Sequence, residues 1–171
     1  TEELRFQLEE DPEGPAAQAY YRSHGLEMEI NEKEDYYRRW MMLLPKNRME
    51  GMKYPLVIAN HGGGNAIETD EFAFGLPQIA AREGFLILYA QNTNYENIGR
   101  LMETAAEKYP VDEERIYIMG YSQGGYQATS ALFRMPWKLA GAAPCGNDIF
   151  REWDNFNVPY TREEYANLKK A

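Results

Sequence analysis

The fold is decided by the stretch Ile116-Tyr117-Ile118-Met119-Gly120-Tyr121-Ser122-Gln123-Gly124-Gly125. Its first four residues form a short apolar run, which predicts a buried strand. The next five match the pattern G-x-S-x-G, and residues 126–134 continue with the apolar spacing of a helix. A serine at such a turn needs glycine two positions before and after it, because the strand and the helix approach closely there. We therefore predict that Ser122 is a nucleophile presented above a sheet.

The helix after the serine should turn one stripe inward, formed by Tyr126, Thr129, Leu132 and Phe133. A plainer interpretation stays open at this point: Gly120 and Gly124 could simply make a tight turn, with Ser122 as the cap of the helix. The pentapeptide alone is short enough to arise by chance. Its surroundings in the chain therefore have to decide.

A second glycine-rich motif, His61-Gly62-Gly63-Gly64, directly follows the apolar run Leu56 to Ala59. Successive glycines leave backbone N–H groups unobstructed, as the stabilisation of a tetrahedral oxyanion requires. We expect this oxyanion hole to be formed by the N–H groups of Gly63, Gly64 and Gln123, with Gly63 ranked above Gly64. A phosphate-binding loop is the alternative, but the spacing G-x-G-x-x-G is not met. His61 is interpreted as a structural residue that orients its loop by hydrogen bonding.

Short apolar runs alternate with helical patterns after residue 51, which predicts a parallel sheet with crossover helices. One helix should run from Pro77 to Arg82 and be closed by Gly84. A second, ended by Pro110, is indicated by one apolar face made of Ile98, Leu101, Met102, Ala105 and Tyr109. The predicted parallel strands are Leu56–Ala59, Phe85–Tyr89, Ile116–Met119 and Leu139–Ala143.

The order of these strands leaves one open edge. The first two runs should pair with each other, the third should lie on the other side of the first, and the fourth should pair outside the third. Unpaired backbone groups on that outer strand favour association with other polypeptide. We expect the edge to be covered by a second copy in a homo-oligomer, by the tail after Ile149, or by polypeptide outside this sequence.

The first 50 residues are interpreted as outer antiparallel strands. Strand-like patterns occur from Leu4 to Leu8 and from Leu26 to Leu44. Between them, the prolines and glycine of Asp11 to Pro15 argue against regular structure. Period-two alternation from Tyr36 to Leu44 predicts a half-buried strand, which Pro45 should end.

Together these motifs resemble the α/β-hydrolase superfamily, and within it the polyhydroxybutyrate depolymerase and feruloyl or acetyl-xylan esterase group. Segments 54–64, 80–89 and 109–125 carry the resemblance. It implies an α/β-hydrolase fold, with a mostly parallel sheet and crossover helices. It also implies hydrolysis of small-molecule or polysaccharide-linked esters through an acyl-enzyme on Ser122, without a cofactor. The run Gly120 to Tyr126 is also similar to serine peptidases of the prolyl-oligopeptidase type, so a peptidase is the alternative.

The chain departs from this family in one respect, because no histidine follows Ser122. Asp148 could be the acid by position, although a polar loop residue is the preferred interpretation. We expect residues 1–171 to be one partial domain: outer strands in 1–50, a parallel core in 51–148 and the start of a lid in 149–171. It would be truncated after the sixth strand of a protein of about 250 to 300 residues. A non-catalytic hydrolase domain used for binding is the alternative that the missing histidine favours.

Composition limits the partners. A net charge of -9, with basic residues clustered no further than in pairs such as Arg38 and Arg39, argues against nucleic acid. No apolar run approaches the roughly 20 residues that span a bilayer, so no membrane association is expected. One cysteine, Cys145, and two histidines, His24 and His61, leave little material for a disulfide or a metal site. The compartment stays open between the cytoplasm and secretion.

Overall fold

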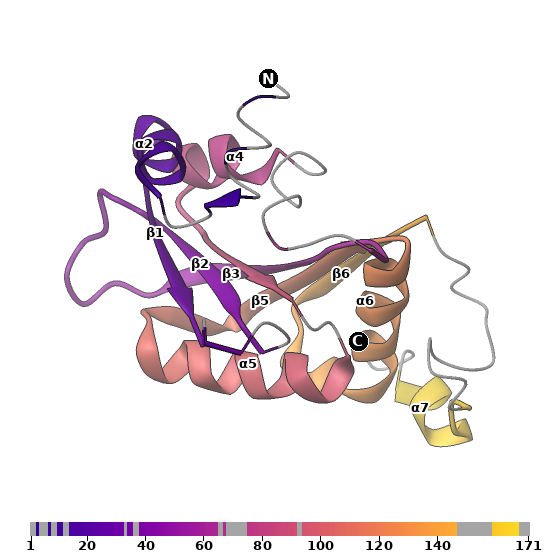
Figure 1. The fold of residues 1–171 in the computed structure, drawn as a ribbon. Helices are drawn as coiled ribbons and strands as arrows, with labels where there is room; N and C mark the ends of the chain where they lie inside the picture. The colour runs from indigo at the N-terminus through magenta and orange to yellow at the C-terminus, as the bar shows by residue number, and fades with distance from the viewer. Residues whose placement is uncertain are drawn as a thin grey trace.

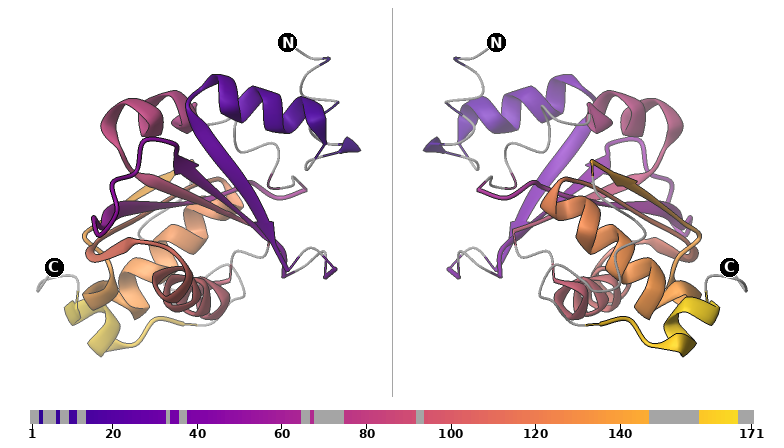
Figure 2. Two further views of the ribbon diagram at one scale, coloured as in Figure 1. Left: turned by 90° about the vertical axis from the view of Figure 1, so that its left-hand side faces the viewer. Right: turned by 90° about the vertical axis from the view of Figure 1, so that its right-hand side faces the viewer.

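Helices cover both faces of one sheet (Figure 1). The computed structural model describes residues 3, 7, 10, 11, 14–32, 34, 35, 38–64, 67, 75–91, 94–146 and 159–167. In these ranges α2 and α4 pack on one face of the sheet, and α5 and α6 pack on the other (Figure 2). The described elements are α2 (Pro15–Ser23), β1 (Leu26–Asn31), β2 (Trp40–Pro45), β3 (Tyr54–Asn60), α4 (Leu76–Glu83), β4 (Leu86–Ala90), α5 (Tyr95–Lys108), β5 (Val111–Tyr121), α6 (Gln123–Arg134), η2 (Pro136–Lys138), β6 (Gly141–Cys145) and α7 (Arg162–Asn167).

The strands lie in the order β1-β2-β4-β3-β5-β6. The pairs formed by β4, β3, β5 and β6 are parallel, whereas β1 and β2 are antiparallel strands at one side. The predicted parallel strands and their neighbours are therefore confirmed, although β6 begins at Gly141, two residues later than predicted, and β5 begins at Val111, five residues earlier. Asn60 pairs with both Ala90 and Gly120, so the carboxyl ends of β3, β4 and β5 lie together at one edge of the sheet.

Strand β4 shows why the sheet needs two helical layers. Leu86 and Leu88 belong to the core under α5 and α6, whereas Ile87 and Tyr89 belong to the core under α2 and α4. Successive side chains of a strand point to opposite faces, so a strand covered on both sides is apolar throughout.

Strand β2 corrects the half-buried strand predicted from Tyr36 to Leu44. It begins at Trp40, and every one of its residues is buried. The reason is its position, because β2 lies between β1 and β4 and helices cover both of its faces. Tyr36 and Tyr37 lie outside the described residues.

Helices α4 and α5 form where the sequence predicts them. Gly84 follows α4 with a φ of 74°, a left-handed conformation that glycine adopts without steric penalty. The side-chain oxygen of Asn94 caps α5 by accepting a hydrogen bond from the Asn97 N–H at 2.7 Å. The predicted face of α5 is buried at Ile98, Leu101, Met102 and Ala105. Within the described ranges, no helix combines the length and apolar character needed to cross a membrane.

Helix α6 differs in part from its predicted inward stripe. Two residues of that stripe, Tyr126 and Leu132, are only half-buried, and the other two are buried. Ala128 and Ala131 instead face the core shared with the sheet. Their small side chains let the helix lie close to the strands.

The amino-terminal region contains a helix that the sequence analysis missed. Helix α2 begins at Pro15, in the segment from Asp11 for which regular structure is not expected. Proline is favoured at the first helical position, where its missing N–H is not needed and its φ already fits. Gln7 is the one described residue of the strand predicted from Leu4 to Leu8, and it is helical. Its carbonyl accepts a hydrogen bond from the Asp11 N–H at 3.0 Å.

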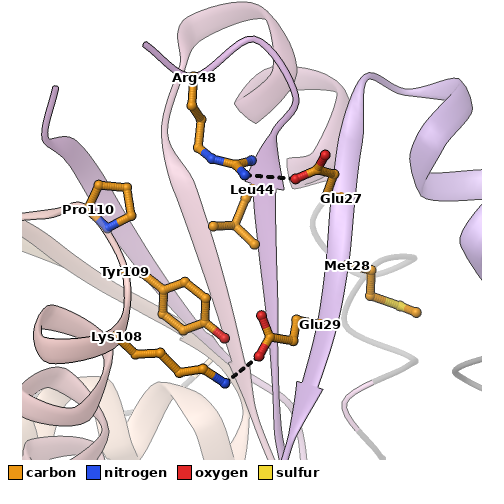
Figure 3. Close-up of a pocket in the computed structure, with 8 residues that line it drawn as sticks. All are labelled: Glu27, Met28, Glu29, Leu44, Arg48, Lys108, Tyr109 and Pro110. Carbon is orange, nitrogen blue, oxygen red and sulfur yellow. Dashed lines mark hydrogen bonds and ion pairs between the residues drawn. The ribbon is translucent and has the colours of Figure 1, made fainter. Parts of the chain in front are cut away.

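The end of the sheet opposite to Ser122 has a polar cavity whose charges pair with one another (Figure 3). Its two ion pairs are Glu27–Arg48 and Glu29–Lys108. The hydrogen bond to Glu29 raises the pKa of Lys108, and burial raises the pKa of Tyr109. The Tyr109 hydroxyl accepts a hydrogen bond from Asn31 Nδ2 at 2.9 Å. The contacts of Lys108 and Tyr109 connect β1 to the end of α5, and the Glu27–Arg48 pair connects β1 to the segment after β2.

Strand β6 pairs with β5, and no other described strand lies on its outer side. The Ala140 N–H, just before β6, donates to the Ile116 carbonyl at 2.7 Å. Since successive N–H groups of a strand point to opposite sides, those of Gly141 and Ala143 point away from β5. The described part of the tail packs on α6, where the rings of Tyr160 and Phe133 stack at 4.4 Å. The expected cover of this edge therefore stays a prediction.

We expect the outward N–H groups of Gly141 and Ala143 to exchange slowly with solvent, because an edge of small apolar residues is stable when another polypeptide segment pairs with it. Hydrogen exchange followed at single amides measures this, with the inward N–H of Ala140 as the internal reference. Exchange at the rate of the exposed Gly51 would contradict a covered edge.

Candidate active site

Ser122 stands at the amino end of α6 in a strained backbone conformation. Its φ is 54° and its ψ is −112°, and among the described residues other than glycine only Glu32 shares a positive φ. Such a conformation costs on the order of 1–3 kcal/mol and persists where the surrounding structure enforces it. The Ser122 N–H donates to the Cys145 carbonyl at 2.9 Å, and the Ser122 carbonyl accepts from the Tyr126 N–H at 3.2 Å. The residue is therefore held from both sides.

The hydroxyl of Ser122 does not act as a helix cap. Ser122 occupies the cap position of α6, but its side chain makes no capping hydrogen bond. Asn94 shows the ordinary arrangement at the start of α5, with an extended backbone and a side chain that accepts from the Asn97 N–H. The interpretation of Ser122 as a simple cap does not account for this difference. A nucleophile, in contrast, needs a hydroxyl that is not engaged in a capping hydrogen bond.

Two glycines allow the turn by leaving no side chain in the way. A Cβ placed on Gly120 would lie 2.2 Å from the Gly124 carbonyl oxygen. A Cβ placed on Gly124 would lie 2.1 Å from the Asn60 carbonyl oxygen and 2.7 Å from that of His61. The start of α6 therefore rests directly on the backbone at the end of β3.

The glycine-rich loop after β3 reaches the first residue of α6. A Cβ placed on Gly63 would lie 2.9 Å from Gln123 Oε1, so these two residues lie against each other. Gly63 and Gly64 are exposed, and Gly64 has a φ of 77° that favours glycine. In the described part of the chain, no backbone carbonyl accepts a hydrogen bond from the N–H groups of Gly63, Gly64 or Gln123. Gln123 is the first residue of α6 and Gly63 lies against its side chain, so their N–H groups lie near the positive end of that helix, an arrangement suited to an anion.

The rings of both histidines contact backbone carbonyl oxygens. His61 is buried, with Nδ1 2.7 Å from the Gly62 carbonyl oxygen and Nε2 2.8 Å from that of Gln91. His24 lies at the end of α2, with Nδ1 2.9 Å from the Tyr20 carbonyl oxygen. The interpretation of His61 as a residue that orients its loop agrees with these contacts.

Asp148 lies outside the described residues, so the structure does not place it. Among the residues that are described, His, Cys, Asp and Glu do not gather in threes that could hold a metal ion. Cys145 is exposed on β6, and its backbone carbonyl is the acceptor for the Ser122 N–H.

Two residues that the sequence analysis does not single out help to hold the site. Asn60, buried at the end of β3, donates from Nδ2 to the Met119 carbonyl at 3.2 Å. Gln91, buried just after β4, lies against His61 and accepts a hydrogen bond at Oε1 from the Ile67 N–H at 3.2 Å. Their positions at the carboxyl ends of parallel strands are the signal that could have identified them.

Comparison with known sequences identifies a distant relative. The chain matches no family model. It is 23% identical over 136 residues to a bifunctional acetylxylan esterase/xylanase from Neocallimastix patriciarum. That alignment covers 68% of this chain and 20% of the relative, so the chain spans about a fifth of that protein.

Solved structures show the same architecture. The fluorophosphonate-binding serine hydrolase FphF of Staphylococcus aureus aligns with a TM-score of 0.63 and 15% identity, over 85% of this chain and 73% of that one. A feruloyl esterase module from Clostridium thermocellum aligns with a TM-score of 0.64 and 12% identity, over 86% and 61%. An acetyl xylan esterase from Aspergillus awamori aligns with a TM-score of 0.61 and 13% identity, over 78% and 57%. The chain has the α/β-hydrolase fold, which confirms the fold expected from the sequence.

Alanine at position 124 is expected to disrupt the site, because its Cβ would collide with the backbone of Asn60. We expect Gly124→Ala to unfold the protein or to lower its free energy of unfolding by about 3 kcal/mol or more. Gly99→Ala in α5 is the matched control, since its Cβ would lie 3.7 Å from Met135 Sδ, an ordinary contact. Greater helix propensity should stabilise that variant by about 0.5–1 kcal/mol. Urea denaturation measures both, and a Gly124→Ala variant of wild-type stability would contradict the described packing.

Strain at Ser122 can be measured by comparing two variants that both lack the hydroxyl. Ser122→Gly should be more stable than Ser122→Ala by about 1 kcal/mol, because glycine adopts a positive φ freely and alanine does not. Thermal and urea unfolding of the two proteins give the difference. An alanine variant at least as stable as the glycine variant would argue against a strained turn.

Proposed function

We propose that this chain carries the nucleophile and the oxyanion hole of a serine hydrolase that cleaves carboxylic esters. The observation that carries the proposal is the strained Ser122, whose hydroxyl makes no capping bond although it occupies the cap position. The N–H groups of Gly63 and Gln123, which donate to no backbone carbonyl among the described residues, support the same function. Similarity to an acetylxylan esterase/xylanase and to a feruloyl esterase module supports an ester as the substrate.

The reaction would begin with attack of Ser122 Oγ on the carbonyl carbon of the ester. As the Oγ–C bond forms, the carbonyl oxygen becomes an oxyanion, which the N–H groups of Gln123 and of Gly63 or Gly64 bind. Collapse of this intermediate breaks the bond to the alcohol, which leaves with the proton released from Oγ. Water then attacks the acyl-enzyme, the carboxylic acid leaves and Ser122 is restored. This sequence needs no cofactor.

A general base has to carry the proton from Oγ to the leaving alcohol. The ring of His61 faces two carbonyl oxygens, and His24 lies at the end of α2, so neither is assigned this role. No histidine follows Ser122 in the sequence. We therefore assign the nucleophile and the oxyanion hole to this chain.

The substrate class that we propose is a small-molecule or polysaccharide-linked ester, with acetyl and feruloyl groups as the first acyl groups to test. A peptidase would use the same nucleophile and oxyanion hole on an amide. A binding domain would need neither. Short-chain nitrophenyl esters, feruloyl esters, acetylated xylan and a peptide anilide distinguish these three functions.

We expect the 171-residue chain to hydrolyse p-nitrophenyl acetate slowly, at a rate about 10⁴-fold or more below that of an enzyme with an intact catalytic triad. The reason is that no histidine follows Ser122 to act as the general base beside the oxyanion hole. Imidazole added to the solution should supply a base and raise the rate. Release of nitrophenolate measures the rate, and mass spectrometry detects the acyl group on Ser122. Ser122→Ala with the same imidazole is the control, because imidazole itself cleaves this ester.

Equal rates for the wild-type chain and Ser122→Ala at every imidazole concentration would contradict the proposal and favour a binding domain. Cleavage of the peptide anilide without cleavage of any ester would assign a peptidase. Fast ester turnover that needs no imidazole but disappears in Ser122→Ala would show that this chain contains a base.

A further inference from the structure

One peptide group joins the ring of His61 to the proposed oxyanion donor. The carbonyl of Gly62 and the N–H of Gly63 belong to this group, and in a trans peptide they point in opposite directions. His61 Nδ1 lies 2.7 Å from the Gly62 carbonyl oxygen. A hydrogen bond there fixes the plane of the peptide, and with it the direction of the Gly63 N–H.

The ring of His61 is held in turn by Gln91. Its Nε2 lies 2.8 Å from the Gln91 carbonyl oxygen, and both residues are buried, at 8% and 9% exposure. Each ring nitrogen of His61 therefore lies within hydrogen-bond distance of one carbonyl oxygen, and the ring is held between Gly62 and Gln91.

The side chain of Gln91 holds a second point of the same loop. Its Oε1 accepts a hydrogen bond from the Ile67 N–H at 3.2 Å, and Ile67 is fully buried in the core under α4. Gln91 is itself fixed, because its N–H donates to the Arg39 carbonyl at 3.1 Å, just before β2. One residue thus contacts the loop at His61 and again at Ile67.

We propose that Gln91 is a positioning residue for the oxyanion hole. Its backbone carbonyl orients the His61 ring, its side chain holds Ile67, and the ring then sets the direction of the Gly63 N–H. This inference rests on the proposed function, because an oxyanion forms only if the chain hydrolyses esters. The positioning of the loop can be measured without turnover.

Substitution of His61 by two amides of different length tests the contact with Gly62. Asparagine places its amide nitrogen near the position of Nδ1, and glutamine places it near that of Nε2. We expect His61→Asn to keep the Ser122-dependent rate within about 3-fold, and His61→Gln to lower kcat about 10- to 100-fold with KM nearly unchanged. The oxyanion forms only in the transition state, so its loss reduces kcat.

Substitution of Gln91 tests the contact with Ile67. Gln91→Met has a similar length but no amide oxygen, and we expect it to lower kcat about 10-fold at constant KM. Gln91→Glu restores an acceptor and should recover most of that loss. Tyr109→Phe is the control for general destabilisation. It removes the hydrogen bond from Asn31 at the opposite end of the sheet and should leave kcat unchanged.

The amide signals of Gly62, Gly63 and Gly64 in NMR spectra give a readout that does not depend on activity. We expect them to shift in Gln91→Met and in His61→Gln, and to stay near the wild-type positions in His61→Asn. If the wild-type chain shows no turnover that depends on Ser122, the proposed function fails, and these signals still decide the positioning role.

Wild-type kcat together with unshifted glycine signals in Gln91→Met would overturn the inference. Equal loss of activity in His61→Asn and His61→Gln would overturn the part assigned to Nδ1. If circular dichroism shows that Gln91→Met does not fold, the His61 pair decides, because both of its variants leave the side chain of Gln91 in place.

Discussion

The contact of bare backbone between α6 and β3 is the constraint on which the rest of the site depends. No side chain fits between Gly124 and the carbonyl of Asn60, and none fits between Gly120 and Gly124. The helix can therefore begin directly above the end of the central strands. That closeness brings Gln123 against the glycine-rich loop and leaves Ser122 in a conformation that few residues adopt unaided. Hydrogen bonds on both sides of Ser122 and the buried packing of α6 offset the cost of that conformation.

The fold could be predicted from the sequence where a local pattern agrees with tertiary packing. Helix α5 has one apolar face, a cap at its start and Pro110 after its end, and these three signals point to the same element. Strand β2 could not be predicted as fully buried, because burial of its second face depends on β1, β4 and the helices around them. Helix α2 was missed because proline has opposite effects at two positions. It breaks a helix in the interior, but at the first position, which Pro15 occupies, it favours one.

The residues of the site also fall into those that the sequence could predict and those that it could not. Ser122, Gln123 and the loop glycines belong to motifs that are contiguous in sequence, so their residue types and spacing could be recognised. The residues that hold these groups belong to no motif. Gln91 is 30 residues from His61 in the chain, and the two meet only because Ala90 and Asn60 pair at the ends of neighbouring strands. Such contacts follow from strand order and register, which exist only once the sheet has formed.

The outer strand β6 also offers an experimental opportunity. Cys145 of this strand is exposed and is the one cysteine of the sequence. Its backbone carbonyl accepts a hydrogen bond from the Ser122 N–H. A fluorophore joined to that thiol by maleimide chemistry would report from the neighbouring strand on ligands that approach Ser122. No other thiol would have to be removed first. Cys145 is thus a single labelling site close to the proposed nucleophile.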